Sequence, residues 1–245
     1  MKKAVSGHIV AMGGGGFSME PDNPLLDDFV LSLARPKAPR VCFIPSASAD
    51  SATYITKFYR HFANRCIATD LTLFDLTGLP RQPATTDDLD AFVQAQDVFY
   101  VGGGNTAHLL AMWRVHGLDV LLRRAWRSGA VLCGLSAGMI CWFEGGVTDS
   151  FGGLKYMEDG VGLLRGSACP HYDGEPGRRP AYKEMIARGA PAGYAADDSV
   201  ALHFEGTRFK EAVSSRPDAQ AWRVARRRGE AVETPLDVRY LGTSR

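Results

Sequence analysis

The sequence contains no apolar stretch approaching the roughly 20 residues of a membrane-spanning helix, and its longest apolar stretches have the length of a strand. The N-terminal Met1-Lys2-Lys3 is followed by a short apolar segment, residues 8–12, and then by four glycines, which is not the pattern of a signal peptide. We therefore expect no membrane partner.

An excess of charge is also missing, since 28 Lys and Arg residues face 27 Asp and Glu residues, for a net charge of +1. Such a chain has no overall field that would recruit nucleic acid, so we expect no nucleic-acid partner. The five cysteines have neither the paired spacing of a disulfide framework nor that of a metal site. These features predict a cytoplasmic protein without a metal ion.

Short apolar segments separated by helical patterns fill the first half of the 245-residue chain. They predict strands at residues 9–12, 41–44, 71–74, 98–101 and 130–132, helices at residues 24–33, 54–62, 106–113 and 118–127, and a helix start at residues 85–88. Wholly apolar strands alternating with helices predict a parallel sheet covered on both faces. Residues 199–241 show short alternating segments, typical of antiparallel edge strands. Because no repeat or linker interrupts the pattern, we expect one α/β domain over residues 1–245.

One strand-to-helix junction, residues 134–138, reads Gly-Leu-Ser-Ala-Gly. In the G-x-S-x-G turn, the flanking small residues permit strained backbone angles that expose the serine hydroxyl above the sheet, and the next amide points toward a developing negative charge. The motif makes Ser136 a candidate nucleophile. The five residues alone are equally compatible with an ordinary tight turn.

A second glycine-rich loop, residues 102–106, follows the preceding strand. The loops at the carboxyl ends of neighbouring parallel strands converge on one crevice, so this loop can bring bare backbone N–H groups close to a substrate oxygen. Asn105 or Thr106 is also expected to cap the next helix.

A serine nucleophile needs a base and an acid that orients the base. Six histidines are available: His8, His61, His108, His116, His171 and His203. We favour His171, because it ends an apolar stretch and enters a loop rich in glycine and proline. Candidates for the acid are Asp149, shortly after the junction helix, and the pair Asp197 and Asp198 in a turn before a strand, and the pattern does not choose between them.

Taken together, these segments resemble the peptidase E and cyanophycinase family of serine peptidases. The matching segments occur in the family's order: the glycines of residues 13–16, Ile44-Pro45-Ser46-Ala47-Ser48, residues 101–106, residues 134–138, Gly146-Val147-Thr148-Asp149, Pro170-His171-Tyr172 and the Asp197-Asp198 turn. The resemblance implies the fold of class I glutamine amidotransferases, which is a flavodoxin-like three-layer sandwich with a mainly parallel central sheet.

The resemblance also implies roles for individual residues. Ser136 would be the nucleophile and His171 the general base, with the amides of Gly104 and Ala137 as oxyanion donors. Asp198 and Asp149 both match family positions for the third member, and Asp198 ranks slightly ahead. At the position of Asp198, relatives often carry glutamate, whose side chain is longer than that of aspartate.

Substrate recognition is a further implication of the resemblance. Peptidase E removes an N-terminal aspartate from dipeptides, and the arginine that would hold the aspartate matches Arg179, with Asn105 as a second binding candidate. Arg178 and Arg179 could equally be the solvated start of a helix. The expected partner is a short peptide, without a cofactor, and the antiparallel C-terminal strands could support a homodimer. Cyanophycin-type isoaspartyl bonds remain an alternative substrate.

Other classes match less of the sequence. An α/β-hydrolase would usually place its histidine near the end of the chain, where none follows His203. A dinucleotide site requires G-x-G-x-x-G, but Ser18 occupies the last position of the pattern that begins at Gly13. An amidotransferase needs a cysteine where Ser136 stands. A catalytically silent scaffold of the same fold is the alternative to an enzyme.

Overall fold

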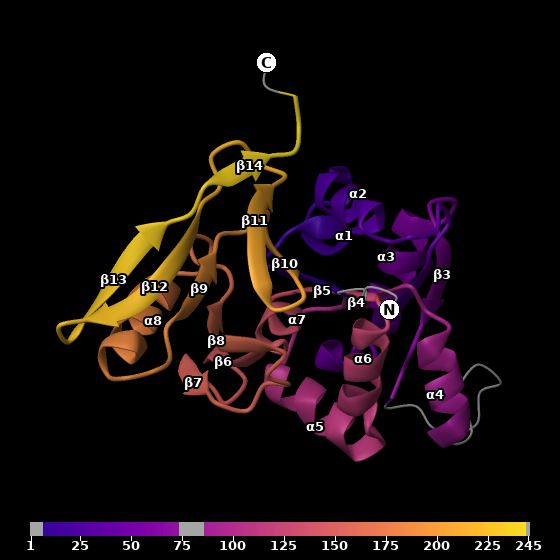
Figure 1. The fold of residues 1–245 in the computed structure, drawn as a ribbon, viewed down its shortest axis with the longest axis horizontal. Coiled ribbons are helices and arrows are strands. Elements are labelled where there is room, and N and C mark those ends of the chain that lie inside the picture. The colour runs from indigo at the N-terminus through magenta and orange to yellow at the C-terminus, as the bar shows by residue number, and fades with distance from the viewer. Residues whose placement is uncertain (1–6, 74–85, 244–245) are drawn as a thin grey trace, which may run out of the picture.

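The computed structural model describes residues 7–73 and 86–243, and these residues form two sheets with associated helices (Figure 1). The larger sheet has the strand order β14-β11-β10-β1-β5-β4-β2-β3. Its strands are β1 (His8–Met12), β2 (Arg40–Ile44), β3 (Ile67–Asp70), β4 (Val98–Val101), β5 (Val131–Leu135), β10 (Val200–Glu205), β11 (Arg208–Ser214) and β14 (Val238–Tyr240). The five strands β1 to β5 are mutually parallel, and β10 joins β1 in antiparallel register.

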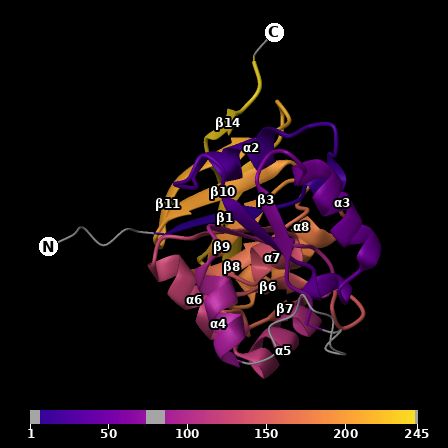
Figure 2. The same ribbon diagram turned by 90° about the vertical axis from the view of Figure 1, so that its right-hand side faces the viewer.

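Helices cover both faces of this sheet, and alternate residues of β1 show why. Val10 and Met12 belong to a buried cluster that receives α1 (Gly16–Met19), α2 (Leu25–Ser32) and α3 (Ala52–Phe62). Ile9 and Ala11 point into a second cluster with α4 (Thr86–Gln94), α5 (Thr106–His116) and α6 (Leu118–Arg127). The side view shows the two groups of helices on either side of the sheet (Figure 2). The predicted three-layer α/β sandwich with a mainly parallel central sheet is therefore confirmed.

The third predicted strand was wrong in position. Residues 71–73 do not form a strand, because β3 ends at Asp70, whose partner in β2 is Phe43. Phe74, the last residue of the predicted strand, and Thr85 of the predicted helix start lie outside the described residues. β3 is an edge strand with little apolar character, whereas Leu71 and Leu73 are buried after its end, so the apolar pattern marked burial rather than strand pairing.

The second half of the chain forms a separate sheet that the sequence pattern did not predict. Its order is β13-β12-β9-β8-β6-β7, with strands β6 (Phe143–Thr148), β7 (Lys155–Met157), β8 (Leu164–Cys169), β9 (Gly193–Ala196), β12 (Ala221–Arg227) and β13 (Glu230–Pro235). The helix α8 (Arg178–Ala187) packs on this sheet. The predicted antiparallel edge strands are therefore divided, with β10 and β11 in the large sheet and the β12–β13 hairpin in the small one.

Within the described ranges, no helix is both long enough and apolar enough to cross a bilayer. The five cysteines are free thiols.

Candidate active site

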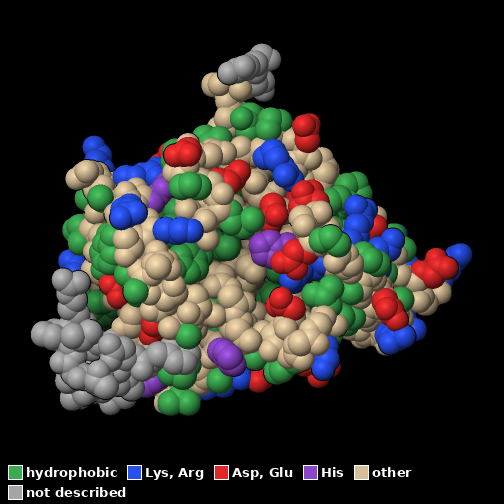
Figure 3. Space-filling view, turned by 180° about the vertical axis from the view of Figure 1, so that it is seen from behind, with side chains coloured by type: hydrophobic (Ala, Val, Ile, Leu, Met, Phe, Trp, Pro, Cys, Tyr) green, Lys and Arg blue, Asp and Glu red, His purple; other side chains and the backbone are tan. Residues whose placement is uncertain are grey.

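The loops that carry the candidate residues open at the carboxyl ends of the parallel strands. In the order β1-β5-β4-β2-β3, the chain passes from β2 outward to the edge strand β3 and from β4 in the opposite direction to β5. The direction of the connections therefore reverses between the neighbouring strands β2 and β4. Ligands of open α/β sheets bind in the crevice at such a reversal. The space-filling view shows a hollow lined mostly by backbone and uncharged side chains, with a histidine and acidic side chains at its rim (Figure 3).

Ser136 stands at the junction of β5 and the short helix α7 (Ala137–Ile140). Its backbone has φ 57° and ψ −112°, a strained conformation that non-glycine residues rarely adopt. Both flanking glycines are required, because a Cβ on Gly134 would lie 2.8 Å, and one on Gly138 2.5 Å, from the carbonyl oxygen of Val101. The junction thus has the local geometry of a nucleophile elbow, with a partly exposed serine.

The glycine loop after β4 lies directly beside this serine. A Cβ on Gly103 would be 3.3 Å from Ser136 Cβ, and one on Gly104 would be 2.2 Å from the carbonyl oxygen of Ala47. Gly104 has φ 136°, is exposed, and belongs to a loop fixed by the hydrogen bond from Asn105 N to Ala47 O at 2.8 Å. Within the part of the chain that the structure describes, the amides of Gly104 and Ala137 donate to no protein acceptor. Two free donors therefore flank the serine.

Asn105 caps the helix that follows, as expected. Its Oδ1 accepts from His108 N at 2.9 Å, and its Nδ2 donates to Ser150 O at 3.2 Å. Both ends of the side-chain amide therefore already have protein partners. A role for Asn105 in substrate binding stays a prediction.

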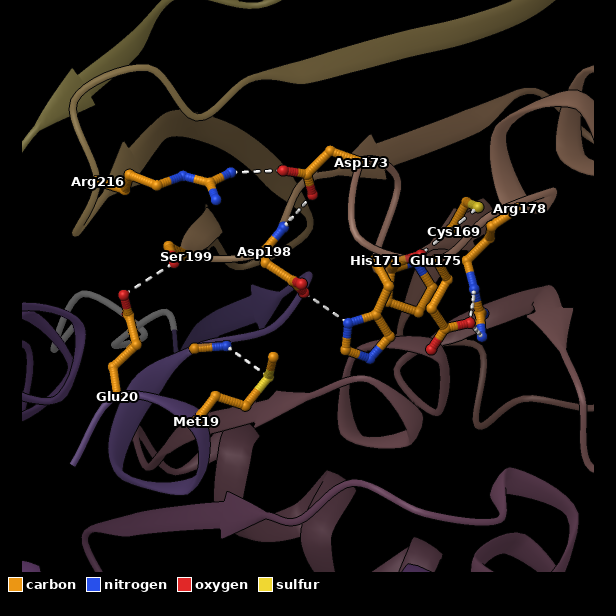
Figure 4. Close-up of polar contacts among 12 residues, drawn as sticks. Met19, Glu20, Cys169, His171, Asp173, Glu175, Arg178, Asp198, Ser199 and Arg216 are labelled. Atoms are coloured by element: carbon orange, nitrogen blue, oxygen red, sulfur yellow. Dashed lines mark hydrogen bonds and ion pairs between the residues drawn. The ribbon is translucent and has the colours of Figure 1, made fainter.

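His171 contacts Asp198, as Figure 4 shows. Its Nδ1 donates to Asp198 Oδ1 at 2.6 Å, and the side chain is 10% exposed. A Cβ on Gly14 or on Gly174 would lie 2.1 or 2.2 Å from a carboxylate oxygen of Asp198, so glycine at both positions lets the acid approach. Among the described residues, no hydrogen bond joins the Ser136 hydroxyl to His171.

The end of β1 connects the three parts of the site through consecutive carbonyl groups. Met12 O accepts from Ser136 N at 3.1 Å and Gly13 O accepts from His171 N at 3.2 Å. Gly14 O accepts from the amide of Ser199, the residue after Asp198, at 3.3 Å. The first glycines after β1, which could suggest a phosphate loop, thus serve as a close-packed support for the candidate catalytic residues.

Asp149 lies apart from the histidine–aspartate pair. Its carboxylate is exposed and has no hydrogen bond or ion pair to the described residues. Its neighbours Thr148 and Ser150 bond to each other at 2.7 Å, and Ser150 Oγ accepts from Ala107 N at the start of α5. Of the two acids left open by the sequence, Asp198 is therefore the one that contacts His171.

Arg179 has protein partners that the sequence did not suggest. Its Nε and Nη2 donate to the two carboxylate oxygens of Glu233 on β13, at 2.9 and 3.2 Å. The guanidinium also lies over the rings of Tyr172 and Trp222, at 5.2 and 4.8 Å from their centroids. A group engaged in this way is not free to hold a substrate carboxylate. The neighbouring Arg178 is 2% exposed, so it is not part of a solvated helix start.

Sequence reasoning also missed Asp173, which follows His171 by two residues. Asp173 Oδ1 accepts from Asp198 N at 2.8 Å, and its other oxygen pairs with Arg216 (Figure 4). Burial opposes ionisation of Asp173, but these hydrogen bonds lower its pKa. In contrast, burial raises the pKa of Asp197 to about 6. The position of Asp173 in a glycine- and proline-rich loop gave no local signal of this contact.

Comparisons with known proteins identify the family of the chain. The model of peptidase family S51 matches residues 9–212. The uncharacterized peptidase YgaJ of Bacillus subtilis (strain 168) is 51% identical over 236 residues, which cover 96% of this chain and 99% of that relative. Two solved structures are similar in fold. A peptidase from an acI-B1 Actinobacterium gives a TM-score of 0.69 at 18% identity, with 96% of each chain covered. A peptidase E protein from Listeria monocytogenes EGD-e gives a TM-score of 0.60 at 17% identity, covering 87% of this chain and 100% of that one.

The family match spans both the elbow serine and the histidine–aspartate pair, and the curated relative aligns over nearly its whole length. The chain therefore belongs to peptidase family S51 and is a serine-type peptidase.

Proposed function

We propose that the chain hydrolyses short peptides, with Ser136 as nucleophile, His171 as general base and Asp198 as the acid that orients the imidazole. The observation that carries this proposal is the 2.6 Å hydrogen bond from His171 Nδ1 to Asp198 Oδ1. A proton fixed on Nδ1 leaves the lone pair on Nε2, which is the form of the ring that accepts a proton from a hydroxyl.

In the proposed reaction, Ser136 Oγ attacks the peptide carbonyl carbon while its proton moves to His171 Nε2. The protonated ring then gives this proton to the leaving amine, and the C–N bond breaks to leave an acyl ester on the serine. A water molecule then attacks the ester carbonyl while the same ring takes its proton, and the ring returns this proton to Ser136 Oγ as the acyl C–O bond breaks and the acid product leaves. The backbone amides of Ser136 and His171 donate to the consecutive carbonyl groups of Met12 and Gly13, so the nucleophile and the base are held by the same strand end.

The free amides of Gly104 and Ala137 are the proposed oxyanion donors. Both lie beside Ser136, and the glycine loop is fixed by the contact of Asn105 with Ala47. Donors that are already oriented stabilise the tetrahedral oxyanion without reorganisation, and loss of one such donor typically costs about 10²–10³ in kcat.

Two candidate substrate classes remain within this proposal: dipeptides with an N-terminal aspartate, and peptides with isoaspartyl bonds. Selection of aspartate by Arg179 would require the guanidinium to leave Glu233. Because that pair is bidentate and stacked on two aromatic rings, we propose that Arg179 supports the His171 loop instead of binding the substrate. A catalytically silent scaffold is less well supported, since the elbow, base and acid are all present.

The test is a panel of dipeptides, isoaspartyl dipeptides and amino-acid p-nitroanilides, assayed with the purified protein and with Ser136→Ala. The variant should retain its fold and lose about 10⁴- to 10⁶-fold in kcat. The matched control is Ser32→Ala, which removes an exposed hydroxyl on α2 and should keep full activity. Wild-type turnover by Ser136→Ala would exclude the proposed nucleophile.

A further inference from the structure

A pocket of about 280 Å³ lies between α1 and α3, and none of the proposed catalytic residues lines it. Its lining residues are Phe17, Ser18, Pro21, Lys57, Arg60 and His61. The three basic residues are spaced i, i+3 and i+4 on α3, so they project from one face of the helix. The pocket therefore combines two outer cations, a hydroxyl group and an apolar floor.

The two outer cations are unpaired. Neither Lys57 nor Arg60 forms an ion pair or hydrogen bond within the described ranges, although Arg65 at the end of the same helix pairs with Asp28. His61 differs, because its Nε2 lies 3.0 Å from the buried carboxylate of Asp27. His61 thus has Asp27 and also Arg65 Nη1 (2.7 Å) as neighbours, while the ammonium and guanidinium groups at the pocket have no ion-pair partner among the described residues.

One tyrosine separates this pocket from Ser136. Tyr54 lies one helical turn before Lys57, and its ring is 5.6 Å from that of Phe17 in the pocket floor. The Tyr54 hydroxyl accepts a hydrogen bond from Gly103 N at 3.3 Å. Gly103 in turn lies directly against Ser136, where an added Cβ would be 3.3 Å from the serine Cβ. The pocket and Ser136 are therefore linked by consecutive contacts through Phe17, Tyr54 and Gly103.

The geometry points to this pocket as a subsite for a carboxylate of the peptide substrate, held by Lys57 and Arg60. This inference rests on the proposed function and names the chemistry of its substrate. Ammonium and guanidinium groups donate charge-assisted hydrogen bonds to a carboxylate, and Phe17 and Pro21 offer apolar contact to a side-chain stem. The carboxylate is either the C-terminus of a short peptide or the side chain of an aspartate or glutamate.

The variant that tests the subsite is Lys57→Gln/Arg60→Gln. Its matched control is Arg226→Gln/Arg227→Gln, which removes the same charge from exposed, unpaired positions on β12. For a cleaved acidic peptide, the pocket variant should raise KM about 10- to 100-fold, because hydrogen bonds to charged groups contribute up to about 100-fold in affinity. The value of kcat should change little, because these hydrogen bonds act equally in the bound state and the transition state. The control should match the wild type.

A binding measurement separates this inference from the proposed function. Calorimetry with Ser136→Ala uses Ala-Ala-Glu and Ala-Ala-Gln, each with a free or amidated C-terminus. If the C-terminal carboxylate is bound, amidation weakens both peptides, and if the side chain is bound, the Glu-to-Gln change weakens binding. Adding Lys57→Gln/Arg60→Gln should remove that difference.

The outcomes are distinct for the two proposals. Cleavage that depends on Ser136, together with equal affinity for anionic and neutral peptides, overturns the subsite and leaves the peptidase intact. Charge-selective binding that is lost in the pocket variant supports the subsite even when no peptide of the panel is cleaved. Equal loss of affinity for neutral and acidic peptides in the pocket variant also overturns it, because it would indicate a general structural effect.

Discussion

The backbone amide of Asp198 donates to Asp173 Oδ1 at 2.8 Å, while the carboxylate of the same Asp198 accepts a hydrogen bond from His171 Nδ1 at 2.6 Å. Asp173 is fixed from its other side by Arg216, on the connection between β11 and β12. The acid that orients the histidine is thus held at its backbone by a second acid, only two residues from that histidine. Asp198 therefore contacts the imidazole, whereas Asp173 and Arg216 position Asp198.

Replacing Asp198 by Asn should leave the fold intact and lower kcat by up to about 10⁴-fold. The amide has nearly the same shape, but it favours the wrong tautomer of His171 and does not stabilise the imidazolium. Asp149→Asn is the control, because the exposed Asp149 carboxylate contacts no described residue. Steady-state kinetics on one peptide compare the two, and equal losses would contradict the assignment of Asp198.

Asp173→Asn tests a positioning role. The Asn oxygen still accepts from Asp198 N, but a negative charge near His171 is removed and Arg216 is left unpaired. Without this charge the backbone of Asp198 is held less firmly, so its carboxylate should meet His171 Nδ1 in a less exact geometry. We expect kcat to fall about 10-fold with KM little changed, because only the positioning of the catalytic groups is affected. Steady-state kinetics and thermal melts check this, and a lower melting temperature with wild-type kcat would show that Asp173 acts only on stability.

Asp197 should make the protein less stable as the pH rises. Burial raises its pKa to about 6 in the folded state, against an ordinary value of 3.8 for an aspartate side chain. Between pH 3.8 and about 6, the folded state holds a proton that the unfolded state has released. The free energy of unfolding therefore decreases as the pH rises through this window, by on the order of 2 kcal/mol. Denaturant melts at pH 4, 5, 6 and 7 should show that Asp197→Asn lacks this part of the decrease. Parallel pH curves for variant and wild type would contradict the prediction.

Arg179→Met should reduce kcat/KM for Asp-X and Ala-X dipeptides by similar factors. The guanidinium donates to Glu233, which also accepts a hydrogen bond from the Tyr172 hydroxyl at 2.6 Å. Loss of the guanidinium should therefore disturb the loop next to His171 without removing a substrate contact. Paired measurements on the two dipeptides test this. A loss confined to Asp-X would mean that Glu233 releases the arginine when substrate binds.

The sequence predicts those parts of the fold in which local pattern and tertiary pairing agree. The strands near residues 9–12, 41–44 and 98–101 are wholly apolar because both faces are buried. The edge strand β3 is not apolar, so its position was missed. The second sheet was missed because β6 and β8 contain glycine and charged residues, and β8 pairs in parallel with β9 across α8, which leaves no continuous apolar signal.

The candidate site divides in the same way. Ser136 lies in a motif whose small residues are required by local geometry, and His171 follows an apolar strand, so both could be found from the sequence. Asp173, Glu233 and the unpaired Lys57 look like ordinary surface residues in the sequence. Their partners are 25 or more residues away or absent, and only the tertiary arrangement shows which charges are neutralised.

The end of β1 has a consequence for synthesis of the chain. Its carbonyl groups at Met12, Gly13 and Gly14 accept amides from residues 136, 171 and 199. β1 leaves the ribosome first, but the amides that bind its carbonyl groups emerge more than a hundred residues later. The nascent chain therefore carries the nucleophile long before the base has its acid, and peptide-cleaving ability should arise only after residue 199 has left the exit tunnel.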